Sequence, residues 1–421
     1  MRFSSVLPLA FACSAVAVVI PSPKAAWPYG PLVTDGRWIR NTKNEVVTPV
    51  GVNWPGHGEA MIPEGLQYAS INKVLKDIKS LNLNIIRLTF SIQMIDEIYS
   101  KGNDTTVKES FLKALGTTNG TAIYKKFLQK NPQFDDTTTR LQVFDAVAAE
   151  ALKQEIYVHL DNHISRAEWC CGETDGNAWF GDTYFNVANW KRGLAYMADH
   201  GKAWPALVSL GLRNEPRNAT NNPTISKTYN WETWYKNMIP AANGVNAANP
   251  GLLIYFSGLN YDTTLAPITT GANLGSGTVF RKSDFPYSNK LVLELHNYQT
   301  TATTCPSITN GLYNGGYNAL NATDPKVKNV LPVVMTEWGH DMSNNEYKGV
   351  YQTCLDSYLG GLKAGWMFWE VGGSYYTRQG KQDFDETWAL FNHDWTNWRQ
   401  KASAESIKEM AKRTLAGTKK L

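Results

Sequence analysis

Two segments of the sequence end in a glutamate that follows a short apolar run. Residues 208–212 precede Glu215, and residues 332–336 lead directly to Glu337. The runs lack helical periodicity, which indicates buried strands of a parallel sheet. Pro216 ends the first strand because proline has no backbone N–H to donate. If a closed barrel brings both strand ends to one mouth, the two carboxyl groups can serve together as a pair of catalytic carboxylates.

Other polar side chains recur with the two-residue period of a strand. His296 and Tyr298 alternate in one expected strand, so their side chains share a face. His159, Asp161 and His163 alternate in another, which is one way to build a metal site. The chain has no His-Glu-x-x-His segment and no remaining cysteine-ligand pattern, so we expect no metal and no cofactor. We favour His163 as a contact for substrate.

With these motifs in order, the sequence resembles glycoside hydrolase family 5, a family of retaining β-glycosidases with a (β/α)8 barrel. The resemblance runs from about residue 50 to about residue 370. The stretch 161–171 is similar to a branch with plant and fungal members. The matching segments are 86–88, 160–163, 214–216, 294–298, 336–339 and 365–370.

The resemblance implies a role for each matching residue. Glu215 is implied as the acid/base and Glu337 as the nucleophile. Arg87 would keep Glu337 ionised, and Asn214 would donate a hydrogen bond to the 2-hydroxyl of the sugar. A rate that depends on two such carboxyls is bell-shaped, with an expected optimum at roughly pH 4–6.5. In this scheme the charge of Glu337 raises the pKa of Glu215, and Arg87 lowers the pKa of Glu337.

The remaining matches concern the sugar and the supporting hydrogen bonds. Tyr298 would bond to the nucleophile, and His296 would orient the acid/base or the sugar. Trp369 would offer an apolar face to a sugar ring. A core position is the alternative for each of these side chains. Five more tryptophans are candidate platforms for a sugar ring, and we expect two of them to face the cleft. They are Trp54, Trp169, Trp179, Trp231 and Trp234.

The elements that must position these residues alternate between strands and helices, which predicts a parallel sheet, and eight strands argue for closure. Helices are expected at residues 70–81, 139–154, 187–200 and 350–362. A hairpin over residues 38–47 would close the bottom of the barrel. Residues 91–138 are too long for a plain loop, so they should carry helices and wall one side of the cleft. The loop 164–185 is expected to face substrate. The predicted fold is therefore a (β/α)8 TIM barrel with an N-terminal β-hairpin and extended βα loops.

Length and composition fit one secreted catalytic domain. The chain has 421 residues, is 43% hydrophobic and carries a net charge of +4, which is too small to indicate nucleic acid or a membrane surface as partner. Residues 1–26 read as a signal peptide cleaved between 17 and 26. Residues 27–421 would form a single domain, a monomer whose partner is a carbohydrate. Glycosylation sequons begin at Asn103, Asn119, Asn218 and Asn321.

Four cysteines remain outside the predicted signal: Cys170, Cys171, Cys305 and Cys354. Adjacent cysteines rarely pair because of strain, so Cys170 and Cys171 are not expected to bond to each other. A bridge between Cys305 and Cys354 is plausible because they lie in neighbouring units. Pairing of these two with Cys170 or Cys171 is the alternative.

Three functions compete for this sequence. The first is a retaining hydrolase of a β-linked glucan or related polysaccharide, with a β-mannanase or a β-glucosidase acting on small or lipid-linked glycosides as variants. The second is a non-catalytic carbohydrate-binding barrel, which has no need for both Glu215 and Glu337. The third is a metal hydrolase built on His159 and His163. The paired glutamates favour the first.

Overall fold

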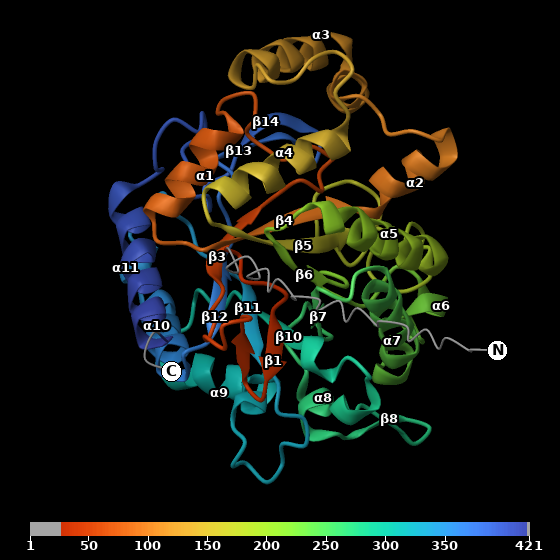
Figure 1. Cartoon of the computed structure of the whole chain (residues 1–421), viewed down its shortest axis with the longest axis vertical. Coiled ribbons are helices and arrows are strands. Elements are labelled where there is room, and N and C mark those ends of the chain that lie inside the picture. Colours follow the sequence, from red (N-terminus) through yellow and green to blue (C-terminus); the bar gives the residue numbers. More distant parts are fainter. Residues whose placement is uncertain (1–26, 419–421) are drawn as a thin grey trace, which may run out of the picture.

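The computed structural model of the chain describes residues 27–418, and eight parallel strands within them close into a barrel (Figure 1). Around the barrel the order is β10-β11-β12-β3-β4-β5-β6-β7. This confirms the predicted (β/α)8 barrel. The strands are Val50–Trp54 (β3), Ile85–Ser91 (β4), Tyr157–Ile164 (β5), Leu207–Gly211 (β6), Leu253–Phe256 (β7), Leu291–Asn297 (β10), Val333–Trp338 (β11) and Gly365–Phe368 (β12).

Helices connect the strands and cover the outside of the barrel (Figure 1). The four predicted helices all form. The first begins after Ser70, whose side chain accepts a hydrogen bond from the backbone N–H of Lys73 and so caps the helix. The connecting helices are Ile71–Ser80 (α1), Arg140–Lys153 (α4), Val187–His200 (α5), Trp231–Ala248 (α7), Cys305–Gly315 (α9) and Val350–Leu362 (α10). Lys401–Thr418 (α11) follows the last strand.

The barrel strands are buried on both faces. Every residue of β4, β5, β10 and β11 is buried, as expected when helices cover a parallel sheet. The last helix, α11, seals the junction between β12 and β3, where the indole of Trp366 donates to the hydroxyl of Thr414 at 3.0 Å. Smaller elements are Pro223–Ser226 (α6), Ala266–Thr270 (α8), Asn273–Gly275 (β8) and Thr278–Val279 (β9).

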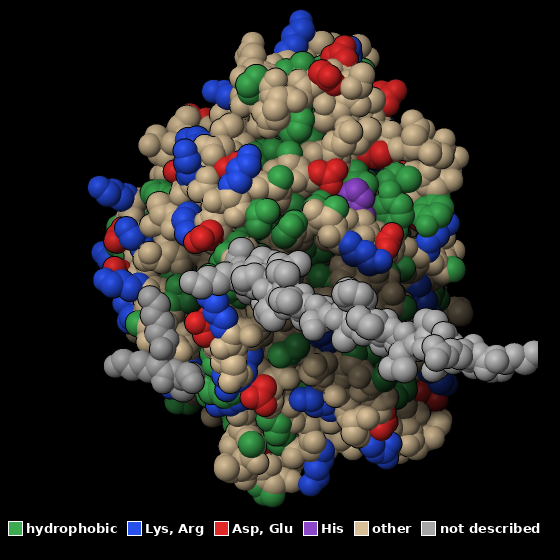
Figure 2. Space-filling view, in the orientation of Figure 1, with side chains coloured by type: hydrophobic (Ala, Val, Ile, Leu, Met, Phe, Trp, Pro, Cys, Tyr) green, Lys and Arg blue, Asp and Glu red, His purple; other side chains and the backbone are tan. Residues whose placement is uncertain are grey.

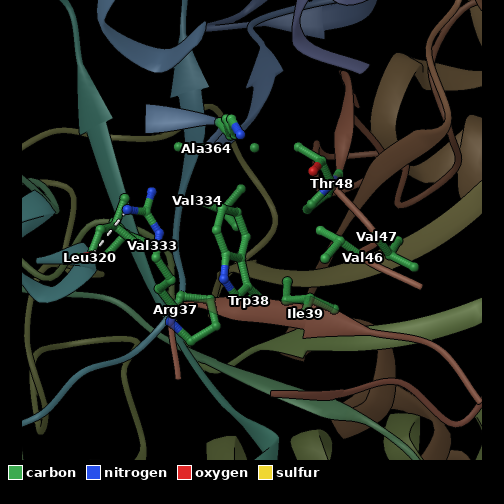
Figure 3. Close-up of a pocket in the computed structure, with 14 residues that line it drawn as sticks. Arg37, Trp38, Ile39, Val46, Val47, Thr48, Leu320, Val333, Val334 and Ala364 are labelled. Carbon is green, nitrogen blue, oxygen red and sulfur yellow. Dashed lines mark hydrogen bonds between the residues drawn. The ribbon is translucent and has the colours of Figure 1, made fainter. Parts of the chain in front are cut away.

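A short hairpin covers the amino-terminal end of the barrel, as predicted, but it lies earlier in the chain. Val33–Asp35 (β1) pairs with Trp38–Arg40 (β2), whereas the expected partner segment makes only a single bridge, Arg40 to Val46. Ile39 of this hairpin packs against the lower layer of the barrel core. Arg37 fastens it by donating to the carbonyl oxygens of Leu320, drawn as a dashed line in Figure 3, and of Leu362. This end of the barrel is therefore closed.

Two insertions build the opposite end. Residues 91–138 contain Ile92–Lys101 (α2) and Val107–Lys130 (α3), which confirms that this segment is helical. A second hairpin, Ser374–Arg378 (β13) with Lys381–Asp385 (β14), follows β12 and was not predicted. Helix α3 lies over this hairpin (Figure 1), and the amide of Gln382 donates to the carbonyl of Leu115 at 3.0 Å. The insertion thus supports the cleft wall from behind.

The surface is mixed in charge. On the face drawn in Figure 2, Lys and Arg side chains alternate with Asp and Glu, and no basic patch stands out. None of the helices within residues 27–418 has the length and apolar character needed to cross a membrane. The predicted signal peptide, residues 1–26, lies outside the described residues.

Candidate active site

A cavity of about 250 Å³ opens at the carboxyl ends of the barrel strands. Six of the eight predicted site residues line this cavity. The other two, Arg87 and His296, are buried behind its walls and contact the two glutamates. The structure therefore gathers all eight predicted residues in one place. Those that line the cavity are His163, Asn214, Glu215, Tyr298, Glu337 and Trp369.

Glu215 and Glu337 face each other across this cavity. Glu337 lies in β11, whereas Glu215 follows the end of β6 with a backbone φ of +46°. This left-handed conformation costs a non-glycine residue about 1 kcal/mol and often occurs at active sites. One carboxylate oxygen of Glu215 lies within 4.8 Å of one of Glu337. Retaining glycosidases space their carboxyls by ~5–5.5 Å and inverting ones by ~6.5–9.5 Å, so the pair has the geometry for double displacement.

Arg87 in β4 contacts groups from four other strands or strand ends. Its guanidinium is fully buried and lies 2.5 Å from Glu337 and 3.0 Å from Asp161. It also donates to the side-chain carbonyls of Asn53 at 2.9 Å and Asn214 at 2.8 Å. Although burial opposes its charge, Asp161 and Glu337 raise the pKa of Arg87. The guanidinium therefore stays charged and fixes the orientation of both Glu337 and Asn214.

Tyr298 and His296 complete the hydrogen bonds of the glutamates. The hydroxyl of Tyr298 donates to Oε2 of Glu337 at 2.8 Å, so both oxygens of Glu337 are held. Nδ1 of His296 lies 2.9 Å from Glu215, and Nε2 lies 3.1 Å from the hydroxyl of Thr336. That hydroxyl donates to Glu294, so it accepts from an Nε2–H of His296. Nδ1 is then free to accept a hydrogen bond from the protonated carboxyl of Glu215.

The pKa values of both glutamates are raised above that of an ordinary carboxyl group. Burial raises the pKa of Glu215 to about 7, against the opposing charges of Arg217 and Arg87. Burial also raises the pKa of Glu337, although His296 and Arg87 act to lower it. Burial lowers the pKa of His296 to about 4, so its ring is neutral near pH 6. The predicted causes of these pKa shifts were therefore incomplete. Burial, rather than the charge of Glu337, raises the pKa of Glu215. At Glu337, burial raises the pKa by more than the charge of Arg87 lowers it.

A layer of buried acids beneath the cavity was not assigned from the sequence. Asp161 lies 2.6 Å from Nδ1 of His163 and so sets the tilt of that ring. Burial raises the pKa of Glu294 to about 8 and that of Asp262 well above its ordinary value. The signal for Glu294 was present, because it stands two residues before His296 and shares its face of the strand.

Among the described residues, His159 and His163 do not share a candidate metal-ligand group. Nδ1 of His159 lies 2.8 Å from the hydroxyl of Ser209, one layer below the cavity, while His163 points into it. Within residues 27–418, no group of three metal-ligating side chains includes His159. The alternation of these two histidines thus reflects strand geometry alone.

One outer wall comes from residues that the sequence analysis did not single out. Arg378 at the end of β13 pairs with Glu386, and its guanidinium lies 3.4 Å from the centre of the Trp169 ring. Trp388 packs against Tyr298, with ring centres 5.8 Å apart, and also lines the cavity. No local signal marked these residues, because their position depends on a hairpin packed against α3.

The tryptophan prediction was only partly correct. Of the five proposed platforms, Trp169 alone lines the cavity. Trp54, Trp179 and Trp234 are fully buried in the core. Trp231 packs edge-on against Trp234, with ring centres 5.3 Å apart.

Both disulfides join pairs that the sequence left open or disfavoured. Cys305 bonds to Cys354, as considered plausible, and links α9 to α10. Cys170 bonds to Cys171, so the expectation that these neighbours would not pair is wrong. Because the barrel places Cys305 and Cys354 together, each of the adjacent cysteines has only the other as a partner among the cysteines of residues 27–418. Their sulfur atoms line the cavity beside Asn214.

Comparisons with known proteins agree with this geometry. The family model described as Cellulase (glycosyl hydrolase family 5) matches residues 43–374. A glycosyl hydrolase 5 family protein from the conifer Chamaecyparis obtusa is 32% identical over 401 residues, which cover 90% of this chain and 66% of the relative. An endoglucanase from Paenibacillus polymyxa is 22% identical over 381 residues, 87% of this chain and 84% of the relative.

Solved structures share the fold. An endocellulase variant from Pyrococcus horikoshii, in complex with cellotetraose, has a TM-score of 0.65 at 18% identity and covers 90% of this chain and 98% of its own. The catalytic domain of the major endoglucanase from Xanthomonas campestris pv. campestris has a TM-score of 0.63 at 19% identity, over 90% and 99% of the two chains. The matched barrel and the extent of the family match show that this chain belongs to glycoside hydrolase family 5.

Proposed function

We propose that this protein is a retaining β-glycoside hydrolase that cleaves a β-linked glucan or related polysaccharide by double displacement. The observation that carries the proposal is the close spacing of Glu215 and Glu337, within 4.8 Å between oxygens, in one cavity. Inversion needs a wider gap, because a water molecule must fit between the attacking base and the sugar. A non-catalytic binding barrel would have no reason to bury two carboxyls at this spacing.

In the first step Glu337 attacks the anomeric carbon while Glu215 protonates the departing oxygen, and a covalent glycosyl-enzyme forms. Arg87 and Tyr298 hold the two oxygens of Glu337 and aim it. In the second step Glu215, now ionised, removes a proton from water, which displaces the sugar from Glu337. Nδ1 of His296, 2.9 Å from Glu215, accepts a hydrogen bond from the protonated carboxyl and so holds it in place before the first step.

The sugar is held by groups around the two carboxyls. Asn214 donates to the 2-hydroxyl, a bond that strengthens as positive charge develops on the ring. Trp369 offers its indole face, and His163 is stacked with it at 5.3 Å between ring centres. These assignments rest on the position of each side chain in the cavity wall.

The substrate class follows from the family and from the relatives. The P. polymyxa relative is described as an endoglucanase, and the P. horikoshii structure contains cellotetraose, which supports a β-glucan for this chain. A mannan or a small or lipid-linked β-glycoside is the second candidate, because Arg378 and Trp388 stand in the cavity wall, where they can contact a bound glycoside. We also propose that the protein is secreted, which the two disulfides support through their need for an oxidising compartment. We propose that it acts as a monomer.

Proton NMR of the first product tests this function. Hydrolysis of an aryl β-cellobioside should release β-cellobiose first, which then mutarotates. The variant Glu337→Gln, which keeps the size of the side chain, should show no hydrolysis above background. Release of the α-anomer first would refute double displacement, and full activity in Glu337→Gln would refute the nucleophile.

A further inference from the structure

The disulfide between Cys170 and Cys171 lies in the wall of the catalytic cavity. Both residues line that cavity together with Glu215 and Glu337. Each sulfur lies within 4.8 Å of a ring nitrogen of His163. Cys171 also lines a second cavity of about 490 Å³, so it forms part of the partition between the two. The bond is thus placed where a sugar in the site would meet it.

The sulfur atoms contact the amide of Asn214. Its Nδ2 lies 3.4 Å from the sulfur of Cys171 and 3.7 Å from that of Cys170. At the other end of the amide, Oδ1 accepts from Arg87 at 2.8 Å. Sulfur is a weak acceptor, but the two contacts together define which end of the amide faces Arg87. One N–H of Asn214 then points at the sulfurs, and the second remains for a hydroxyl of the sugar.

The loop that carries the disulfide has anchors of its own. The buried guanidinium of Arg217 donates to the carbonyl of Gly172 at 2.8 Å and pairs with Asp175 at 2.5 Å. Arg213, also buried, donates to the hydroxyl of Ser165 at 3.1 Å and to the carbonyl of Asn177. Because these bonds do not depend on the sulfurs, the loop should keep its place when the disulfide is removed. Removal therefore acts locally.

We propose that the Cys170–Cys171 disulfide is a specificity-determining element of the substrate site, which holds the amide of Asn214 toward the sugar 2-hydroxyl and presents sulfur atoms to the ring. This inference rests on the proposed glycosidase function. Two separate thiols, or two alanines, would leave the amide held at one end only. The cost should fall on substrates that carry the 2-hydroxyl and should spare those that lack it.

The test compares wild type with the double variant C170A/C171A on two substrates. One is an aryl β-cellobioside, and the other is the same glycoside without the 2-hydroxyl on the ring at the cleaved bond. We expect kcat/KM to fall on the order of 10-fold for the first, as for the loss of one hydrogen bond to a developing charge. For the second we expect a change of less than about 3-fold.

The matched control is C305A/C354A, which removes the other disulfide. Cys305 is exposed on α9, and neither cysteine lines the catalytic cavity. This variant should keep the kcat/KM of both substrates at temperatures below its unfolding transition. Dithiothreitol should reproduce the selective loss in wild type and leave C170A/C171A unchanged.

Two results would overturn the inference. Unchanged kcat/KM in C170A/C171A would show that the disulfide does not contact or position the reacting groups, and equal losses on both substrates would show a general structural effect instead. A wild-type enzyme that hydrolyses neither glycoside would refute the proposed function and this inference with it. The wild-type rate and the ratio between substrates therefore separate the two failures.

Discussion

The charge state of Glu215 gives the sharpest prediction for the catalytic step. Burial raises the pKa of this carboxyl to about 7 from an ordinary 4.5. At pH 6 a carboxyl of pKa about 7 is about 90% protonated, and one of pKa 4.5 is about 3% protonated. Burial thus gives about 30-fold more enzyme in the proton-donating form at that pH. The basic limb of the rate profile should therefore lie near pH 7, just above the optimum of roughly pH 4–6.5 expected from the sequence.

The assay measures kcat/KM between pH 4 and pH 9 for two aryl β-cellobiosides. Phenyl is a poor leaving group that needs a proton, and 2,4-dinitrophenyl is a good one that does not. In Glu215→Ala, kcat/KM for the phenyl substrate should fall about 10²–10⁴-fold, which is the usual contribution of general acid catalysis to the rate. For the dinitrophenyl substrate, kcat/KM for formation of the glycosyl-enzyme should fall far less. The basic limb of the pH profile should disappear.

The control is Glu405→Ala, which removes an exposed carboxyl on α11. It should leave both substrates and both limbs unchanged. If Glu215→Ala retains the basic limb near pH 7, another group causes it. If kcat/KM falls by the same factor for both substrates, Glu215 does not act as the proton donor.

Three further predictions concern the same network. Glu337→Ala should lose at least ~10³-fold in rate, and azide should restore part of it by attacking the anomeric carbon from the vacated space; near wild-type turnover would exclude Glu337 as the nucleophile. Arg87→Met should move the acidic limb to higher pH with the barrel intact by circular dichroism, because it removes a charge that lowers the pKa of Glu337; an unmoved limb in folded protein would contradict this. Glu215→Gln should raise the free energy of unfolding at pH 8 by up to about 3 kcal/mol, measured with urea, and leave it unchanged at pH 4. The sign follows because the folded pKa is raised, so the stability that protonated Glu215 provides below about pH 4.5 is lost as the pH rises through about 7; equal stability at pH 8 would argue against the raised pKa.

The parts of the site that could be predicted are those that depend on strand geometry. Side chains at strand ends such as Glu337 and His296 follow from an apolar run, a period of two and the closure of the barrel. The helices could be predicted in the same way. For α1, the capping residue Ser70 and the helical spacing of the apolar residues after it are local signals. Apart from the closure of the barrel, these features require only short-range sequence information.

The rest depended on contacts between distant segments. The β13–β14 hairpin, which brings Arg378 to the cavity, is braced by Leu115 of α3, more than 250 residues earlier. The bond between Cys170 and Cys171 depends on where Cys305 and Cys354 lie. The pKa of Glu215 depends on burial, which exists only in the folded chain. None of these can be read from neighbouring residues.

The closure of the barrel by β12 and β3 has a consequence for biosynthesis. Met367 pairs with Gly51, more than 300 residues away in the chain, and the bond from Arg87 to Glu337 spans 250 residues. Contacts of such long range form slowly and late, and domains on the ribosome begin to fold from the amino terminus. The catalytic pair therefore has no defined geometry until nearly the whole polypeptide has been translated. A nascent chain that stops before β12 should have no hydrolytic activity, and its exposed strand edges would make it a target for chaperones.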